Sequence, residues 1–297
     1  MHWKSWLHRL RWMFQRERER PAPPTTPGPE PRRPPRMEVG WATDVGRQRS
    51  LNEDAVLVME AWQEGHYAMP PVGLFLLADG MGGHRAGEVA SALAVRTAAR
   101  HILQNLWAAL SDQHHSADEP SLQEVLTDAF RRAHEAVTGR VPGGGTTLLC
   151  ALLLGDRAYI ANVGDSRAYL VSPQGCRQIT RDHSVVDMMV ELGQMTAEEA
   201  ARHPQRNVLY RAVGQRGTLE VDTFICTLSP GEVLLLCSDG LWETVGGAEI
   251  VRVVTASASL QEACDTLVEK ANQAGGRDNI SVILAAPGCE GSVASGV

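Results

Sequence analysis

Two short apolar segments of the sequence each run into an aspartate that is followed by glycine. Residues 74–77 lead into Ala78-Asp79-Gly80, and residues 233–236 lead into Cys237-Ser238-Asp239-Gly240. Segments of this length with almost no polar residue are typical of strands buried on both faces. An Asp-Gly pair at the end of such a strand places a carboxylate at the sheet edge and lets the backbone turn behind it. The two segments therefore predict a packed sheet core with carboxylates at its edge.

The order of the other segments indicates an α+β fold. A long helix is predicted after the first buried strand, with Val89, Leu93 and Ile102 on its apolar face, and two later helices begin at capping sequences, Ser121 with Glu124 and Ser259 with Glu262. Strands separated by pairs of helices predict a four-layer α-β-β-α sandwich, in which two mainly antiparallel sheets pack face to face and helices cover both outer faces. The strand-like segments are residues 38–44, 54–60, 72–78, 146–154, 158–163, 168–171, 177–180, 219–228, 232–237 and 280–286.

The two ends of the chain differ in composition from its middle. Residues 1–20 place Trp and Leu at helical spacing among Lys and Arg, which predicts a basic amphipathic segment; it either docks on an anionic membrane surface or a partner, or is a disordered extension. Residues 21–36 are rich in proline and predict a semi-rigid or disordered linker. We therefore expect one domain over residues 37–287, followed by a disordered tail over residues 288–297.

Charge and cysteine content exclude several classes of function. Residues 1–36 hold nine Lys and Arg against three Glu, a charge of +6, so the net charge of −7 leaves −13 for the remainder. An acidic body argues against a nucleic-acid partner and fits cation binding. The six cysteines show no C-x-x-C spacing, which indicates reduced thiols and not a disulfide frame or a zinc site. No apolar run has the length of a spanning helix and no secretory signal is evident, so a cytoplasmic location is expected.

More acidic residues stand beside Gly or Asn at predicted strand ends, namely Asp165, Asp278 and the pair Glu53-Asp54. Carboxylates gathered at one sheet edge repel each other unless cations neutralise them. Oxygen ligands without paired His or Cys favour Mg²⁺ or Mn²⁺ over Zn²⁺. Two such ions, about 3.5–4 Å apart, lower the pKa of a bridging water and stabilise an in-line displacement at phosphorus. The pattern therefore predicts hydrolysis of a phosphate ester.

Six strings in this order resemble the motif set of the metal-dependent, type 2C protein phosphatases over residues 38–286. The string that contains Asp79 is similar to the bacterial branch, whose members commonly oppose Hanks-type serine/threonine kinases. The resemblance implies hydrolysis of phosphoserine and phosphothreonine in proteins, with phosphorylated proteins and a kinase as partners, and we expect a monomer. The strings are Arg49-Ser50-Leu51-Asn52-Glu53-Asp54, Ala78-Asp79-Gly80-Met81-Gly82-Gly83-His84, Gly144-Gly145-Thr146-Thr147, Asn162-Val163-Gly164-Asp165-Ser166-Arg167, Ser238-Asp239-Gly240-Leu241-Trp242 and Arg277-Asp278-Asn279.

The resemblance also implies two Mn²⁺ or Mg²⁺ ions per domain and a ligand for each. Asp79 would bridge both ions, and the carbonyl of Gly80 would bind one of them. Asp239 and Asp278 would hold the other ion. Glu53 would act through bound water.

Other positions are implied to support this centre. Arg49 would bind the substrate phosphate through its planar guanidinium. Asp54 would steady the ligands. Asp165, together with Asp239, would hold a third ion, or else it only stabilises its turn. Residues 182–206 would form a flap beside the site that selects the substrate.

Several alternatives stay open from the sequence. His84 and His183 are candidates for the acid that protonates the leaving group, but Met81 stands where eukaryotic relatives have a His after Asp-Gly, so a structural or rim role is expected for both. A catalytically silent regulatory module on the same fold is disfavoured because the implied ligands are all present. A hydrolase of small phosphate esters is not separated from a protein phosphatase.

Overall fold

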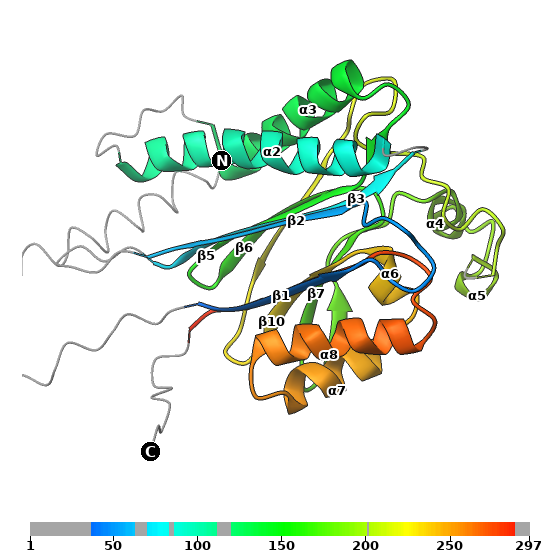
Figure 1. The fold of residues 1–297 in the computed structure, drawn as a ribbon. Coiled ribbons are helices and arrows are strands. Elements are labelled where there is room, and N and C mark those ends of the chain that lie inside the picture. Colours follow the sequence, from blue (N-terminus) through cyan, green and yellow to red (C-terminus); the bar gives the residue numbers. More distant parts are fainter. Residues whose placement is uncertain (1–36, 63–69, 83–85, 112–119, 201, 289–297) are drawn as a thin grey trace, which may run out of the picture.

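The computed structural model describes residues 37–62, 70–82, 86–111, 120–200 and 202–288. Two antiparallel sheets lie face to face, and helices cover the outer face of each (Figure 1). This arrangement confirms the predicted four-layer sandwich. The predicted amphipathic segment and linker, together with residues 289–297 of the predicted tail, lie outside the described residues. Within the described ranges, every helix is too short or too polar to span a bilayer.

The two sheets are built only from antiparallel pairs. The first sheet has the order β1 (Glu38–Asp44), β11 (Ile280–Ala286), β10 (Val233–Cys237), β7 (Arg167–Ser172) and β8 (Gly175–Gln178). The second has the order β2 (Asp54–Ala61), β3 (Val72–Met81), β5 (Leu148–Leu154), β6 (Arg157–Val163) and β9 (Asp222–Thr227). The short strand β4 (Gly145–Thr146) pairs with the end of β3.

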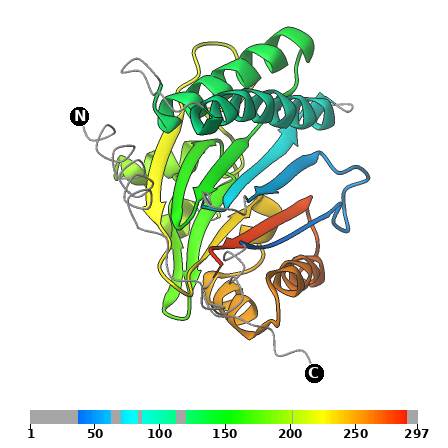
Figure 2. The same cartoon turned by 90° about the vertical axis from the view of Figure 1, so that its left-hand side faces the viewer.

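Two pairs of helices form the outer layers. The second sheet is covered by α2 (Ala86–Ser111) and α3 (Leu122–Arg140), and the first by α7 (Gly247–Ala256) and α8 (Leu260–Gln273), as Figure 2 shows from the side. At the start of α3 the predicted capping box is present, since Ser121 and Glu124 each accept a hydrogen bond from the other's backbone N–H. Helix α8 is likewise capped by Ser259. Three shorter helices are α4 (Val185–Glu191), α5 (Ala197–Ala200) and α6 (Asp239–Trp242).

The apolar core has three parts, one between the sheets and one under each helix pair. The inner strand β3, between β2 and β5, contributes to two of them. Its Leu74 and Leu76 face the cluster under α2 and α3, whereas Phe75 and Leu77 face the other sheet. This double burial explains why its sequence is apolar without alternation.

The chain segments with the predicted site residues meet at one end of the sandwich. Antiparallel register places Asp54 opposite Asp79, and Cys237 opposite both Val282 and Arg167. The β1–β2 loop, the end of β3, the β6–β7 turn, α6 and the α8–β11 loop therefore share that end, on the right of Figure 1. The polar segment with α4 and α5 lies at the same end.

Candidate metal centre

Three of the predicted site residues come together where β2 begins and β3 ends. Asp54 and Asp79 are partners in the β2–β3 register. The amide of Gly80 donates to the carbonyl of Glu53 at 3.1 Å. The hydroxyl of Ser238, one residue before Asp239, donates to Asp54 Oδ2 at 2.9 Å, so Asp54 links the two sheets at this point.

Two threonines where β4 ends and β5 begins, Thr146 and Thr147, hold the backbone of Asp79 by hydrogen bonds. Thr146 Oγ1 and the amide of Thr147 donate to the Asp79 carbonyl at 2.8 Å and 2.9 Å. Thr147 Oγ1 accepts from the Asp79 amide at 2.8 Å and contacts Ser166 Oγ at 2.8 Å. The threonines therefore tie Asp79 to the turn of Asp165. No role was predicted from the sequence for the residues of this Gly-Gly-Thr-Thr string.

The Asp-Gly pair on β3 does not form the predicted turn, whereas the one after β10 follows the end of its strand. Strand β3 continues through Asp79 and Gly80 to Met81, and Asp239 begins the short helix α6. Glycine is needed for close packing: a Cβ on Gly80 would lie 2.3 Å from the carbonyl oxygen of Gly87, and one on Gly240 would lie 2.1 Å from that of Asn279. The prediction of a turn was therefore wrong for Asp79-Gly80, where pairing of the strand continues to Met81.

Asn279 joins two of the loops at this end. Its side-chain oxygen accepts from the amide of Glu53 at 2.8 Å, and its Nδ2 donates to the carbonyls of Val45 and Leu51 at 3.0 Å and 2.9 Å. Its own amide donates to Asp278 Oδ1 at 2.9 Å. Asn279 is only 4% exposed, so these bonds hold the β1–β2 loop against the segment that carries Asp278.

Arg49 and Asp278 contact each other directly. Arg49 Nη2 donates to Asp278 Oδ2 at 2.6 Å, and this hydrogen bond raises the pKa of Arg49. The Arg49 side chain remains 51% exposed and the Asp278 side chain 28% exposed. The implied phosphate-binding group is thus held at the rim by one of the implied metal ligands.

The electrostatics show that the carboxylates crowd one another. Burial, followed by the charges of Asp54, Asp239, Asp165 and Asp278, raises the pKa of Asp79 well above its ordinary value. Burial and the same type of repulsion raise the pKa of Asp239. The pKa of Asp54 rises to about 6 and that of Asp165 to about 7, each mainly through burial. A cluster of this kind is stable in its ionised form only with compensating positive charge.

The donor set fits divalent cations. Asp54 Oδ1 and Asp239 Oδ1 are buried and have no hydrogen-bond partner, which is costly for a carboxylate unless a cation contacts it. Throughout the part of the chain that the structure describes, no three His, Cys, Asp or Glu side chains converge into a complete site by themselves. Both oxygens of Asp278 are engaged, one by Arg49 and one by the amide of Asn279. A cation bound to Asp278 would therefore share a carboxylate oxygen with Arg49 or with the Asn279 amide, since each oxygen has a second lone pair.

The predicted flap is tied to the turn of Asp165. Arg167 donates to both oxygens of Asp182 at 2.6–3.0 Å and stacks on the Trp242 ring with 3.5 Å to its centroid. Trp242 Nε1 donates to the Asp165 carbonyl at 3.1 Å. These contacts fix the start of the flap between the two sheets, a role for Arg167 and Trp242 that the sequence reading did not assign.

The two candidate histidines have different outcomes. His84 lies outside the described residues. His183 is 1% exposed and accepts from the amide of Gly164 through Nδ1 at 3.0 Å. Its Nε2 lies 3.4 Å from Asp222 Oδ2 and 3.1 Å from Arg211 Nη1, and burial with the Arg211 charge lowers the pKa of His183. With both ring nitrogens engaged, His183 is positioned for packing and not for proton donation to a leaving group.

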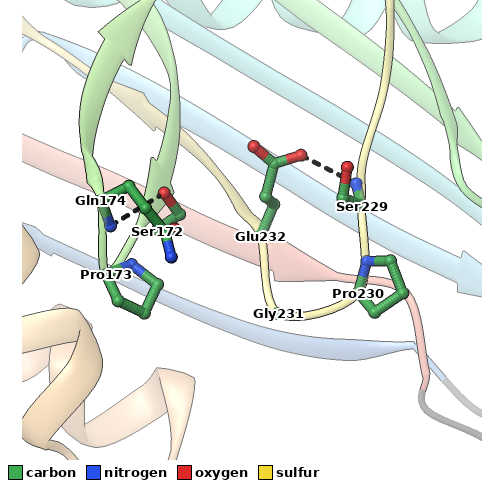
Figure 3. Close-up of a pocket in the computed structure, with 7 residues that line it drawn as sticks. All are labelled: Ser172, Pro173, Gln174, Ser229, Pro230, Gly231 and Glu232. Carbon is green, nitrogen blue, oxygen red and sulfur yellow. Dashed lines mark hydrogen bonds between the residues drawn. The ribbon is translucent and has the colours of Figure 1, made fainter.

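A hollow of about 340 Å³ at the opposite end of the sandwich lacks this chemistry. Figure 3 shows it between the β7–β8 turn and the turn before β10, lined by Ser172, Pro173 and Pro230 among others. Its carboxylate, Glu232, accepts a hydrogen bond from the Ser229 amide at 2.8 Å and so closes its own turn. We assign it no catalytic role.

Comparison with known proteins agrees with this geometry. The family model described as Protein phosphatase 2C matches residues 46–284. The serine/threonine phosphatase stp of Listeria innocua serovar 6a is 39% identical over 248 residues, which cover 84% of this chain and 95% of that protein. The structure of the S. agalactiae serine/threonine phosphatase matches with a TM-score of 0.72 and 33% identity over 84% of this chain and 98% of that one. The catalytic domain of the phosphatase PstP in complex with two manganese ions matches with a TM-score of 0.64 and 32% identity over 84% of this chain and 97% of that one. The chain described here therefore belongs to the protein phosphatase 2C family.

Proposed function

We propose that this chain hydrolyses phosphoserine and phosphothreonine in proteins with the help of divalent cations, and that it reverses the action of a serine/threonine kinase. The observation that carries the proposal is the acidic cluster, in which Asp54 Oδ1 and Asp239 Oδ1 are buried without a hydrogen-bond partner. Relatives named serine/threonine phosphatase, and a matching structure with two manganese ions, support the same chemistry.

Each implied ligand has a defined support in the fold. Asp79 and the Gly80 carbonyl, with Asp239 and Asp278, would hold two Mn²⁺ or Mg²⁺ ions, and Glu53 would act through water. When bound, such ions lower the pKa of water and neutralise charge that develops on a phosphate. Asp165 is 7% exposed at the edge of the same cluster, which supports a role at a third ion.

Arg49 is the group that would orient the substrate. Its side chain is half-exposed at the rim, and only its Nη2 bonds to Asp278, which leaves its other donors for a substrate phosphate. A guanidinium binds two phosphate oxygens at once, which fixes the ester in one orientation. Asn279 acts through these residues, since it positions the loop that carries Arg49 and Glu53.

A cysteine nucleophile has no support among the residues that the structure describes. Cys150 and Cys237 are completely buried, and burial raises the pKa of both thiols. The partly buried Cys176 has a pKa raised to about 11 by burial. Thiols in these environments stay protonated and unreactive at neutral pH, so a covalent phosphocysteine route is disfavoured.

The direct test is the replacement Asp239→Asn, which keeps the shape of the side chain and removes its charge. We expect phosphothreonine-peptide hydrolysis in Mn²⁺ to fall at least about a hundredfold, because a metal contribution of several kcal/mol is lost. Asp265→Asn, on the exposed face of α8, is the matched control and should leave the rate unchanged. Activity that persists in a chelator, or equal rates for both variants, would contradict the metal-dependent mechanism.

Substrate class is tested on the same preparation. Phosphothreonine and phosphoserine peptides should be hydrolysed with a higher kcat/KM than p-nitrophenyl phosphate, because a peptide can contact the flap as well as the cluster. A clear preference for the small ester would indicate a small-molecule hydrolase. Absence of turnover with every ester, although Mn²⁺ binds, would indicate a regulatory module.

A further inference from the structure

A groove of about 580 Å³ lies between α2 and α3 on the outer layer of the molecule. We call it the helix groove. Three arginines line it, Arg100 from α2 and Arg132 and Arg140 from α3, together with the small residues Ala136 and Gly139. The groove is separate from the acidic cluster, and the proposed function gives it no role.

The floor of the groove is open because of Gly139. A Cβ built on Gly139 would meet no atom within 4 Å. Glycine destabilises a helix relative to alanine, and here no close contact requires it. The absence of a side chain at this position instead leaves room above the backbone of α3, beside Ala136.

The walls of the groove carry positive charge. Arg100 and Arg140 are exposed and make no ion pair or hydrogen bond with another residue in the described part of the chain. Arg132 Nε donates to Asp128 Oδ2 at 2.9 Å, so its charge is shared. Glu135 is the carboxylate among the lining residues. Three guanidinium groups against one carboxylate stand out in a chain whose residues after position 36 carry a net charge of −13.

The groove lies along the two helices whose ends are near the acidic cluster. Helix α2 begins beside the site, since a Cβ on Gly80 would contact the Gly87 carbonyl. Thr97, the first lining residue of α2, is ten positions after Gly87, about 15 Å along the helix. Arg140 ends α3 and precedes Gly145, the partner of Met81, by five positions. An extended peptide bridges such a distance with about five or six residues.

We propose that the helix groove is a second contact site for the protein substrate, and that it takes an acidic peptide segment about five or six residues from the phosphorylated side chain. The substrate identity rests on the proposed function, whereas the contacts belong to the groove. Arg100 and Arg140 are the recognising groups, because unpaired guanidinium groups bind carboxylates through paired hydrogen bonds. Glu135 attracts basic segments less strongly than the three arginines repel them, so acidic segments are selected.

The test compares two phosphothreonine peptides. One carries four Glu residues beginning six positions from the phosphothreonine, and the other carries four Gln residues at the same positions. The pair is made once with these residues before the phosphothreonine and once with them after it. With the unaltered protein in Mn²⁺ at low salt, the Glu peptide should have a KM about three- to tenfold lower at equal kcat, the range expected for a few exposed ion pairs. In the double variant Arg100→Glu with Arg140→Glu the ratio of the two KM values should fall to one or reverse. The double variant Arg100→Gln with Arg140→Gln, which removes the charges without reversing them, should bring the two KM values closer together.

The matched control is Arg96→Glu with Arg131→Glu. These two arginines are exposed on the same helices, do not line the groove, and change the net charge by the same amount. The control should keep most of the preference for the Glu peptide. Equal KM values for the two peptides with the unaltered protein would overturn the proposal, and so would an equal loss in the control variant, which would indicate only the general field of the surface.

A binding measurement separates this proposal from the proposed function. A fluorescein-labelled Glu peptide without phosphothreonine is titrated with the full chain in EDTA, and its anisotropy is recorded. Binding that is weakened several-fold in the groove variant but not in the control supports the groove even if no ester is hydrolysed. Identical binding curves for the groove variant and the unaltered protein overturn the groove proposal. Hydrolysis of the Gln peptide, measured separately, tests only the catalytic centre.

Discussion

Asp278 has two competing partners at the scale of single residues. In the structure it accepts a 2.6 Å hydrogen bond from Arg49, yet it is also one of the implied metal ligands. A guanidinium beside a cation site repels the cation and occupies a ligand oxygen. Arg49 is therefore expected to help substrate binding and to weaken metal binding.

Replacement of Arg49 by alanine separates these two effects. We predict that Arg49→Ala raises KM for a phosphopeptide about tenfold or more, since a bidentate phosphate contact is lost. The same variant should bind Mn²⁺ more tightly, as measured by calorimetric titration. Arg47→Ala, in the same loop and equally exposed, is the control for a general change in charge. Weaker Mn²⁺ binding in Arg49→Ala would show that the ion pair organises the site instead of competing with it.

Gly80 shows how a single missing side chain permits the site. A Cβ at this position would lie 2.3 Å from the Gly87 carbonyl oxygen and 2.6 Å from that of Glu53. We predict that Gly80→Ala destabilises the protein by about 1–3 kcal/mol or more, because backbone must move to relieve the contact. Denaturant unfolding measures this change. Gly139→Ala, where the added Cβ meets nothing, should be neutral or slightly stabilising; a similar loss in both variants would argue against the packing explanation.

At the scale of elements, the site is assembled from loops whose connection depends on Asn279. The β1–β2 loop makes backbone bonds to the α8–β11 loop, from the amides of Arg47 and Gln48 to the Gly276 carbonyl at 2.7 Å and 3.1 Å. Asn279 adds bonds to Glu53, Val45 and Leu51. Together they hold the β1–β2 loop, which joins the two sheets, against the α8–β11 loop, which leads into the first sheet.

Asn279→Ala should uncouple these loops. We expect a loss of stability of about 1–3 kcal/mol, because the buried amide of Glu53 and two carbonyls lose their partner. The Mn²⁺ concentration for half-maximal activity should also rise, since Glu53 and Asp278 are no longer held in register. Asn105→Ala, on α2 away from the site, should leave that Mn²⁺ concentration unchanged. A variant that is less stable but has an unaltered Mn²⁺ requirement would mean that Asn279 supports only the fold.

At the scale of the whole molecule, the crowded carboxylates make stability depend on pH and on metal. Burial raises the pKa of Asp54 to about 6 and that of Asp165 to about 7, whereas an aspartate in an unfolded chain has a pKa of about 3.9. Between these values the folded protein binds more protons than the unfolded chain, so the free energy of unfolding falls as pH rises from about 4 to 7. The contribution of Asp54 and Asp165 should accordingly make the metal-free protein less stable at pH 8 than at pH 5.5.

Thermal unfolding in EDTA and in Mn²⁺ at the two pH values measures this linkage. We predict that Mn²⁺ raises Tm more at pH 8 than at pH 5.5, because protons compete with the cation for the same oxygens. The variant Asp165→Asn should show a smaller loss of stability between the two pH values in EDTA. An equal rise in Tm at both pH values would mean that the cation binds elsewhere.

Helix patterns in the sequence predicted the helices unevenly. The capping sequences at Ser121 and Ser259 located α3 and α8 correctly because a cap needs only residues close in sequence. On α2 the pattern placed Val89 on the buried face, but Val89 is 49% exposed. Ala94 and Ile102 of the same predicted stripe are buried, and Ala90 and Ala98 complete the packed face, since small residues allow close approach to the sheet. Helix α7 was not predicted, and its N-cap Gly246 makes no side-chain capping bond.

The sequence alone was sufficient for the fold class and for most strands, because apolar runs and capping residues act over a few neighbouring positions. It also identified the acidic residues, since their flanking Gly and Asn are local signals. Only the tertiary structure decided that Gly80 and Gly240 serve close packing, that Arg49 bonds to Asp278 and that His183 is enclosed. Each of these depends on chain segments seven or more residues away, whose approach is set by the packing of the two sheets and their loops and not by local sequence.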